Sequence, residues 1–148
     1  PKKRPSGHDV GAGFGTDNGG AIPSNLLSIP NSDSNSPYLA ACKALGIKAH
    51  PARFPPKLPE FFIRMLTDPG DLVVDIFAGS NTAGMVAEAE GRRWLGFELD
   101  RSYLAASAFR FLPGASDQVA LQDIYDRVLA GETLDLTSLR AQAELFTG

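Results

Sequence analysis

An acidic residue and a run of small residues form the pattern of greatest chemical interest in this sequence. The run VVDIFAGS (residues 73–80) ends an apolar stretch at Asp75 and passes into a loop, and Glu98 closes a second apolar stretch within FELD (97–100). A strand, a small-residue loop and a helix place backbone N–H groups at the carboxyl end of a parallel strand, where open α/β sheets bind ligands. An acid at the end of the next strand usually binds the two hydroxyls of a ribose. The pattern therefore predicts a nucleoside-cofactor site.

The loop lacks the two common phosphate-binding fingerprints. It has no GxGxxG sequence, and although Gly79 and Gly84 have the glycine spacing of a P-loop, Met85 stands where the phosphate-binding lysine belongs. The earlier run GAGFG (11–15) has Thr16 in the last glycine position and no strand before it, which favours a glycine-rich linker. The sequence therefore indicates a nucleoside cofactor that is bound without a phosphate cradle.

The elements that would position this site form a strand–helix–strand–helix unit of an α/β fold. Apart from Asp75, residues 72–77 are apolar and rich in β-branched side chains, which predicts a strand buried on both faces of a parallel sheet. A second strand is predicted over 93–99, between a helix that ends at Gly91 and a helix that Asp100 or Ser102 caps. Because a stable sheet has about 4–6 strands, we expect an incomplete parallel sheet.

Loops and further helices are predicted on either side of this unit. Residues 1–37 are rich in Gly, Ser, Asn, Asp and Pro, which predicts loops with one short strand at 26–29. A helix is expected over 38–45, and the proline-rich segment 50–59 should run extended. Pro59 suits the first turn of a helix with one apolar face, formed by Phe61, Phe62, Met65 and Leu66. Two more helices follow, one with Leu121, Ile124, Tyr125 and Val128 at helical spacing before Gly131, and a last one over 139–146.

Composition argues against several classes of protein. No apolar run approaches the ~20 residues of a membrane-spanning helix, and PKKRPSGHDV (1–10) lacks the apolar centre of a secretory signal, so we expect a cytoplasmic protein without a membrane partner. Cys42 is the one cysteine, which excludes an internal disulfide. With His8 and His50 as its two histidines, the chain is expected to bind no metal.

The charges are distributed unevenly along the chain. Residues 1–66 carry eight Lys and Arg against four Asp and Glu, whereas residues 67–148 carry six against thirteen. The first part is therefore a candidate surface for a polyanion such as DNA, because Lys and Arg side chains neutralise phosphates. A solvated surface with scattered charges is an equal alternative.

Three motifs, in order, resemble those of one enzyme family. HPARFPPKLPEFFIRML (50–66), VVDIFAGSNTAG (73–84) and GFELD (96–100) are similar to motifs X, I and II of the β-class amino DNA methyltransferases, and the similarity runs from about Arg4 to Leu136. The resemblance implies a Rossmann-like fold that uses S-adenosyl-L-methionine to methylate cytosine N4 in double-stranded DNA within a restriction–modification system. An adenine-N6 enzyme, or a non-catalytic fragment that binds DNA or a partner chain, is the alternative.

The same resemblance implies a set of cofactor-binding residues. Motif X implies that the methionine end of the cofactor contacts His50, Pro51, Phe54, Pro55, Lys57 and Leu58. Motif I implies that the methionine and sulfonium part is surrounded by Asp75, Phe77, Ala78, Gly79, Ser80 and Thr82. Motif II implies that Glu98 holds the ribose.

Each of these assignments has a purely structural alternative. His50 is equally well explained as a loop residue bonded to backbone, and Phe54 and Phe77 as members of the core. Asp75 is also explained as a cap of its loop. Glu98 should meet a ligand hydroxyl or a loop amide, because a carboxylate at the end of an apolar strand is costly to bury without a partner.

The catalytic motif of that family is absent from this sequence. Methylating an exocyclic amine requires a flipped base and acceptors that align the amine with the methyl group, and the family uses Ser- or Asp-Pro-Pro-Tyr. The run from Ser36 to Tyr38 has one proline where two are required, so we assign no catalytic residue. We expect the isolated chain to bind cofactor weakly or not at all and to be inactive, with an N-terminal half or a complementary chain missing.

The chain then divides into three segments. A loop-rich segment (1–49) would join the missing catalytic and recognition half. The cofactor-binding unit occupies residues 50–112, and C-terminal helices occupy residues 113–148.

Overall fold

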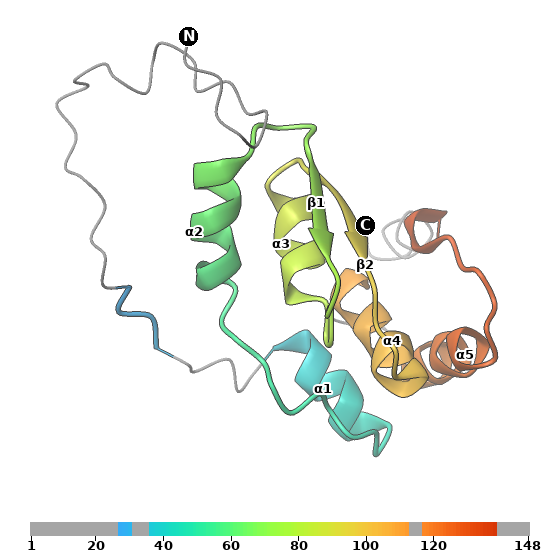
Figure 1. Cartoon of the computed structure of the whole chain (residues 1–148). Coiled ribbons are helices and arrows are strands. Elements are labelled where there is room, and N and C mark those ends of the chain that lie inside the picture. Colours follow the sequence, from blue (N-terminus) through green and yellow to red (C-terminus); the bar gives the residue numbers. More distant parts are fainter. Residues whose placement is uncertain (1–26, 31–35, 113–116, 139–148) are drawn as a thin grey trace, which may run out of the picture.

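The structure, a computed structural model, describes residues 27–30, 36–112 and 117–138. Its elements run in the order α1 (Pro37–Ala44), α2 (Lys57–Leu66), β1 (Leu72–Asp75), α3 (Thr82–Ala89), β2 (Arg93–Gly96), α4 (Arg101–Ser107), the 3₁₀ helix η2 (Ala108–Phe111) and α5 (Gln118–Leu129) (Figure 1). The helix predicted over 139–146, the run GAGFG and His8 lie outside the described residues. Within those residues, no helix is long and apolar enough to cross a membrane.

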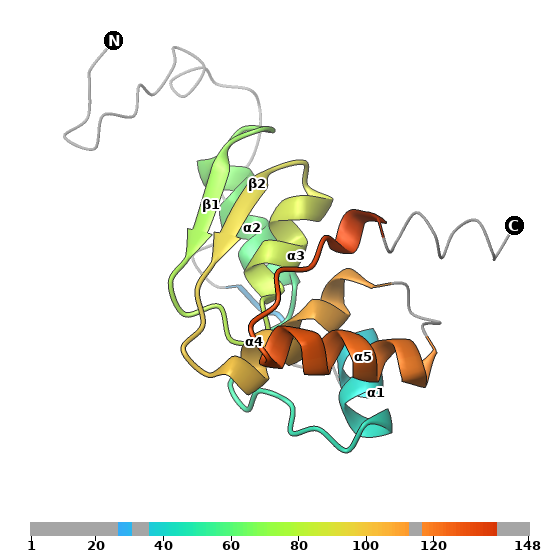
Figure 2. The same cartoon turned by 90° about the vertical axis from the view of Figure 1, so that its right-hand side faces the viewer.

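Strands β1 and β2 pair in parallel, with Val73 opposite Trp94 and Asp75 opposite Gly96. Helix α3 connects them, and α2 and α3 lie on the same face of the sheet (Figures 1 and 2). The predicted strand–helix–strand–helix order and the incomplete parallel sheet are both confirmed for the described part of the chain.

Both strands are shorter than the sequence predicts. Strand β1 ends at Asp75 and not at Phe77, because the Asp75 carboxylate accepts the Phe77 N–H at 3.0 Å and folds the chain into a turn. Strand β2 ends at Gly96, so Glu98 follows the strand and does not end it. The segment 27–30, which includes residues 27–29 of the strand expected at 26–29, has no regular secondary structure.

The inner face of the sheet packs on a small apolar core. Ile63 of α2 and Val86 and Ala87 of α3 are buried there, with Val73 and Trp94 of the sheet packed against them. The buried Ile63 and Val86 side chains each stabilise the fold by about 1.5–3 kcal/mol. This core fixes the position of α3, and with it the loop that leads into the helix.

The apolar face of α2 differs from the prediction. The helix begins at Lys57 and buries Pro59 and Ile63, whereas the exposed fractions of Phe62, Met65 and Leu66 are 43%, 53% and 64%. The reason is that α2 contacts α3 through its Ile63 side, which turns most of the predicted face away from the core.

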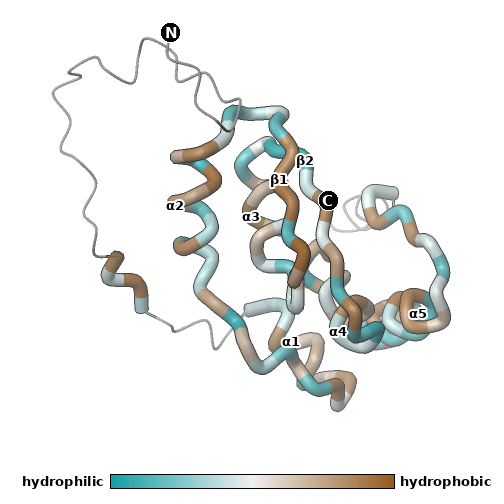
Figure 3. The backbone as a smooth tube through the Cα atoms, viewed as in Figure 1, coloured by the Kyte–Doolittle hydropathy of each residue, from teal (hydrophilic) through white to brown (hydrophobic). Residues whose placement is uncertain are grey.

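The outer face of the sheet is uncovered in the described residues, which makes the prediction of burial on both faces wrong for this part of the chain. The exposed apolar side chains of this face are Leu72, Val74 and Leu95, with Phe97 just after β2, at 51%, 51%, 47% and 52%. The exposed Arg93, which pairs with Leu72, lies on the same face. The cause is that both neighbouring helices pack on the inner face. Figure 3 shows the apolar colour along β1, and Figure 2 shows the sheet with that face free of helices.

A second core lies beyond the carboxyl ends of the strands, where α1, α4, η2 and α5 pack together (Figure 2). Its buried members are Tyr38, Ala41, Cys42, Ala106, Phe109 and Leu121. These residues come from all three sequence segments, and Leu121 and Ile124 are buried on α5 as its helical spacing predicts. The helix cluster therefore stands directly against the end of the sheet where the cofactor site is predicted.

Candidate cofactor site

The loop between β1 and α3 is folded onto the carboxyl ends of both strands. The Phe97 N–H donates to the carbonyl of Asp75 at 2.9 Å, and the Ala78 N–H donates to the carbonyl of Phe97 at 2.8 Å. The Asn81 N–H then donates to the carbonyl of Ala78 at 2.6 Å, which closes a tight turn. The small residues of the loop are thus held at the edge of the sheet that the sequence pattern indicates.

Glu98 joins the two strand ends through its carboxylate. One oxygen, Oε2, accepts the Gly79 N–H at 2.9 Å, and the other, Oε1, accepts the Asp100 N–H at 2.9 Å. The expectation that Glu98 meets a loop amide is therefore confirmed. Because each carboxylate oxygen has two lone pairs, both oxygens retain the capacity to accept a further hydrogen bond.

Gly79 and His50, which belong to different sequence motifs, are in contact. Gly79 has φ of +54°, and a Cβ atom built on it would lie 3.0 Å from Cε1 of His50. The imidazole also forms a T-shaped contact with the Tyr103 ring, at 4.6 Å between centroids, and its Nδ1 lies 3.2 Å from the carbonyl of Ala52. The structure thus supports a backbone-bonded His50 and also places its ring against the predicted cofactor loop.

Asn81 is a residue of this loop that sequence reasoning missed. It is buried, has φ of 57° and caps α3, with its side-chain oxygen accepting the Gly84 N–H at 3.2 Å. A Cβ on Gly96 would lie 3.1 Å from Cβ of Ala78 and 3.4 Å from Asn81 Oδ1, so a larger residue at this position of β2 would press on the turn. The available signal was Asn itself, which tolerates the left-handed region and is favoured at helix N-caps.

Ser80 and Thr82 are buried within the protein. Their hydroxyl oxygens lie 3.4 Å apart, and Ser80 Oγ also accepts a hydrogen bond from Nη2 of Arg110 at 3.0 Å. The exposed fractions of the two residues are 4% and 2%. Their side chains therefore hold the loop in place from the inside.

The remaining predicted residues differ in exposure. Phe77 is 81% exposed and Phe54 37% exposed, so neither is a plain core residue in the described chain. Pro51 is exposed, whereas Pro55, Leu58 and Ala78 are half-buried.

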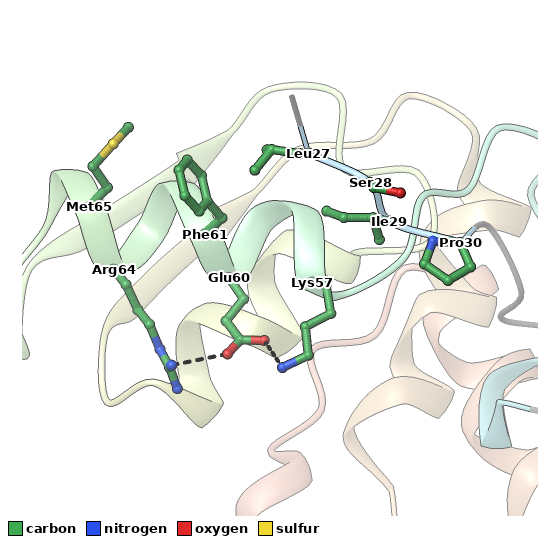
Figure 4. A pocket seen from close by; sticks show the side chains of 9 residues that line it. All are labelled: Leu27, Ser28, Ile29, Pro30, Lys57, Glu60, Phe61, Arg64 and Met65. Carbon is green, nitrogen blue, oxygen red and sulfur yellow. Dashed lines mark ion pairs between the residues drawn. The ribbon is translucent and has the colours of Figure 1, made fainter. Parts of the chain in front are cut away.

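Lys57 lies apart from the residues gathered around Gly79. Its ammonium forms an ion pair with Glu60 at 2.9 Å, and Glu60 also pairs with Arg64 at 3.1 Å (Figure 4). These side chains line a surface hollow of about 650 Å³ between α2 and the segment 27–30. The structure therefore brings together His50, Asp75, Ala78, Gly79, Ser80 and Glu98 but places Lys57 beside this hollow.

Asp100 fixes the start of α4 beside Glu98. Its carboxylate accepts the Ser102 N–H at 2.8 Å, the Ser102 hydroxyl at 2.5 Å and the Tyr103 N–H at 3.3 Å. The Ser102 hydroxyl and N–H groups lower the pKa of Asp100 below its usual value. No group of three His, Cys, Asp or Glu side chains suited to a metal ion occurs in the described residues.

A small-residue loop between a parallel strand and a helix, bonded to an acid after the next strand, is the arrangement at which open α/β sheets bind ligands. The chain belongs to the DNA methylase family, whose sequence profile matches residues 4–109.

Two curated relatives carry more specific names. The chain is 66% identical to the Type II methyltransferase M.PvuII of Proteus hauseri over 139 residues, which cover 94% of this chain and 41% of M.PvuII. It is 44% identical to the DNA adenine methyltransferase YhdJ of Escherichia coli (strain K12) over 55 residues, which cover 37% of this chain and 19% of YhdJ. The chain thus spans well under half the length of the curated relatives it matches.

A solved structure described as the cytosine-N4-specific PvuII DNA methyltransferase matches with a TM-score of 0.75 and 66% sequence identity. The match covers 78% of this chain and 41% of that one. The fold is therefore part of a Rossmann-like methyltransferase fold, as the sequence resemblance implies.

Proposed function

We propose that this chain is the S-adenosyl-L-methionine-binding half of a cytosine-N4 DNA methyltransferase of a restriction–modification system, acting on double-stranded DNA in the cytoplasm. The observation that carries the proposal is the bond between the Glu98 carboxylate and the Gly79 N–H, which holds a hydrogen-bond acceptor beside a loop of small residues. The 66% identity to M.PvuII favours cytosine N4 as the target.

The residues around Gly79 fit this cofactor. Glu98 would accept the ribose hydroxyls, and His50 would line the methionine end beside the loop. When bound, S-adenosyl-L-methionine supplies a methyl group on a cationic sulfonium. The exposed rings of Phe54 and Phe77 would shield that cation from water and attract it through their faces.

The catalytic groups would come from the rest of the enzyme. Ser36 Oγ accepts the Leu39 N–H at 3.4 Å as the cap of α1, and Tyr38 is 1% exposed in the helix core. This stretch therefore has a structural role, which agrees with the absence of a Pro-Pro motif. The uncovered apolar face of the sheet supports a partner segment that completes the fold.

The target base is tested by nucleoside analysis. Unmethylated DNA is treated with the complete enzyme, digested, and its nucleosides are identified by mass. N4-methylcytosine is the expected product. N6-methyladenine would replace the proposal with the adenine-N6 alternative, and unmodified DNA would favour a non-catalytic binding fragment. The isolated 148-residue chain should give no turnover.

The cofactor role is tested in a chimera in which this chain replaces the matching part of M.PvuII, hereafter the chimera. Glu98→Gln should raise the Kd for S-adenosyl-L-methionine about tenfold or more, because a charged acceptor is lost. The matched control is Glu132→Gln. Glu132 follows α5 and forms an ion pair with Arg127 of that helix, so the substitution removes a paired carboxylate outside the candidate site. Equal affinities of the two variants would contradict the assignment of Glu98.

A further inference from the structure

We propose that Arg110 and Tyr38 are positioning residues, a brace that holds the segment at His50 against the loop at Gly79 and Ser80. The proposal rests on the cofactor role proposed above for this loop. Neither residue belongs to the three sequence motifs, and both come from the helix cluster beyond the sheet.

Arg110 holds the loop from the inside. Its Nε donates to the carbonyl of Ser80 at 2.5 Å and its Nη2 donates to Ser80 Oγ at 3.0 Å. Two donors of one planar guanidinium therefore bind two acceptors of one residue, a geometry that the single ammonium of lysine does not reproduce. The contact directs the Ser80 carbonyl inward and so fixes the orientation of the peptide between Ser80 and Asn81.

Tyr38 connects Arg110 to the His50 segment. The guanidinium carbon of Arg110 lies 4.7 Å from the centroid of the Tyr38 ring, within the range of a cation–π contact. The Tyr38 hydroxyl accepts the His50 N–H at 3.0 Å, and the ring is 1% exposed. Because the ring is fully packed, it has little freedom to let either neighbour move.

The contacts form a closed circuit. They run from Ser80 to Arg110, to Tyr38 and to the backbone of His50, whose imidazole returns to Gly79. Arg53 adds a bond from Nη1 to the carbonyl of His50 at 2.5 Å, so both peptide groups of His50 are held. The two motif segments that would enclose the methionine end of the cofactor are thereby fixed relative to each other.

The circuit is tested first in the chain itself by hydrogen–deuterium exchange. Arg110→Lys should increase exchange in peptides that cover residues 78–81 and also in those that cover 49–54, although lysine keeps the charge. Tyr38→Phe should have the same effect on both segments. The matched control is Arg127→Lys on α5, which should change neither. An increase confined to the segment that each residue touches, or no increase, would overturn the brace.

The consequence for cofactor binding is tested in the chimera. Tyr38→Phe and Arg110→Lys should each raise the Kd for S-adenosyl-L-methionine about tenfold, the equivalent of one lost hydrogen bond, while the KM for DNA stays within about twofold. The double variant should raise it by less than the product of the two single effects, because both act through one circuit. An unchanged Kd, or equal increases in the Kd for S-adenosyl-L-methionine and the KM for DNA, would reject a positioning role.

The two proposals fail in different ways. A chimera that contains the unaltered chain and binds no S-adenosyl-L-methionine would contradict the proposed function. The exchange experiment on the chain would still decide whether the brace couples the two segments.

Discussion

At the scale of single residues, the site depends on a glycine in a conformation that other residues rarely adopt. Gly79 combines φ of +54° with the contact to His50, whereas Gly46 has φ of +64° and open space around the position of a Cβ. A substitution at Gly46 therefore reports backbone strain alone, and one at Gly79 reports strain together with a steric conflict.

We predict that Gly79→Ala lowers the free energy of unfolding by about 2–4 kcal/mol and Gly46→Ala by about 1–2 kcal/mol. Urea denaturation of the chain measures both. The difference between the two losses gives the free-energy cost of displacing the His50 ring. Equal losses at the two positions would show that the imidazole moves aside without cost.

Tyr38 should make stability sensitive to alkaline pH. Burial raises its pKa from 10.0 to about 12, so the folded state keeps the neutral phenol while the unfolded chain ionises it. The stabilisation that the buried neutral phenol of Tyr38 gives the fold is complete below about pH 10 and is lost as the pH rises towards 12. Between pH 9 and pH 11, the urea midpoint should therefore fall less in Tyr38→Phe than in the unaltered chain. Parallel falls would contradict the assignment.

At the scale of elements, Asp100 sets the position of α4 relative to Glu98. Because Ser102 lowers the pKa of Asp100, its stabilisation is present above the unfolded pKa and is lost as the pH falls through the lower folded value. Asp100→Asn keeps a capping oxygen without a titrating group. Its thermal midpoint should match the unaltered chain at pH 7 to within a few degrees and fall less between pH 5 and pH 3. If the thermal midpoints of Asp100→Asn and the unaltered chain fall equally between pH 5 and pH 3, this role of Asp100 is rejected.

Some features of the helices and strands could be predicted from the sequence, and others could not. Apolar spacing predicts the parallel strands and α5 because local patterns and packing agree there. The strand ends could not be predicted, since they depend on the Asp75 carboxylate turning back to the Phe77 N–H. Likewise, the buried side of α2 depends on where α3 lies. The spacing of apolar residues within α2 gives no information about that position.

In the candidate site, too, some residues could be predicted from the sequence and others could not. Glu98 and Gly79 could be predicted because the loop pattern constrains residue types directly. The roles of Asn81, Tyr38 and Arg110 depend on contacts between distant segments, such as the bond from Arg110 to Ser80, and no short motif records them. A single sequence thus indicates the residues of the loop pattern better than the residues that hold the loop in place.

At the scale of the whole molecule, the sheet has two unlike faces, and this difference provides a test of the proposed partner segment. Val73 packs on the inner core, whereas its neighbour Val74 is 51% exposed on the outer face. Threonine keeps the shape of valine and adds a hydroxyl that is costly to bury. The same substitution at the two positions therefore reports which face is covered.

In the isolated chain, Val73→Thr should lower the free energy of unfolding by about 1–2 kcal/mol, while Val74→Thr should change it by less than about 0.5 kcal/mol. In the chimera, both substitutions should cost about 1–2 kcal/mol, because the remaining half would cover the outer face. Urea denaturation of the four variants decides between a covered and an open face. If Val74→Thr stays neutral in the chimera, the outer face remains in water there, and the partner segment must bind elsewhere on the chain.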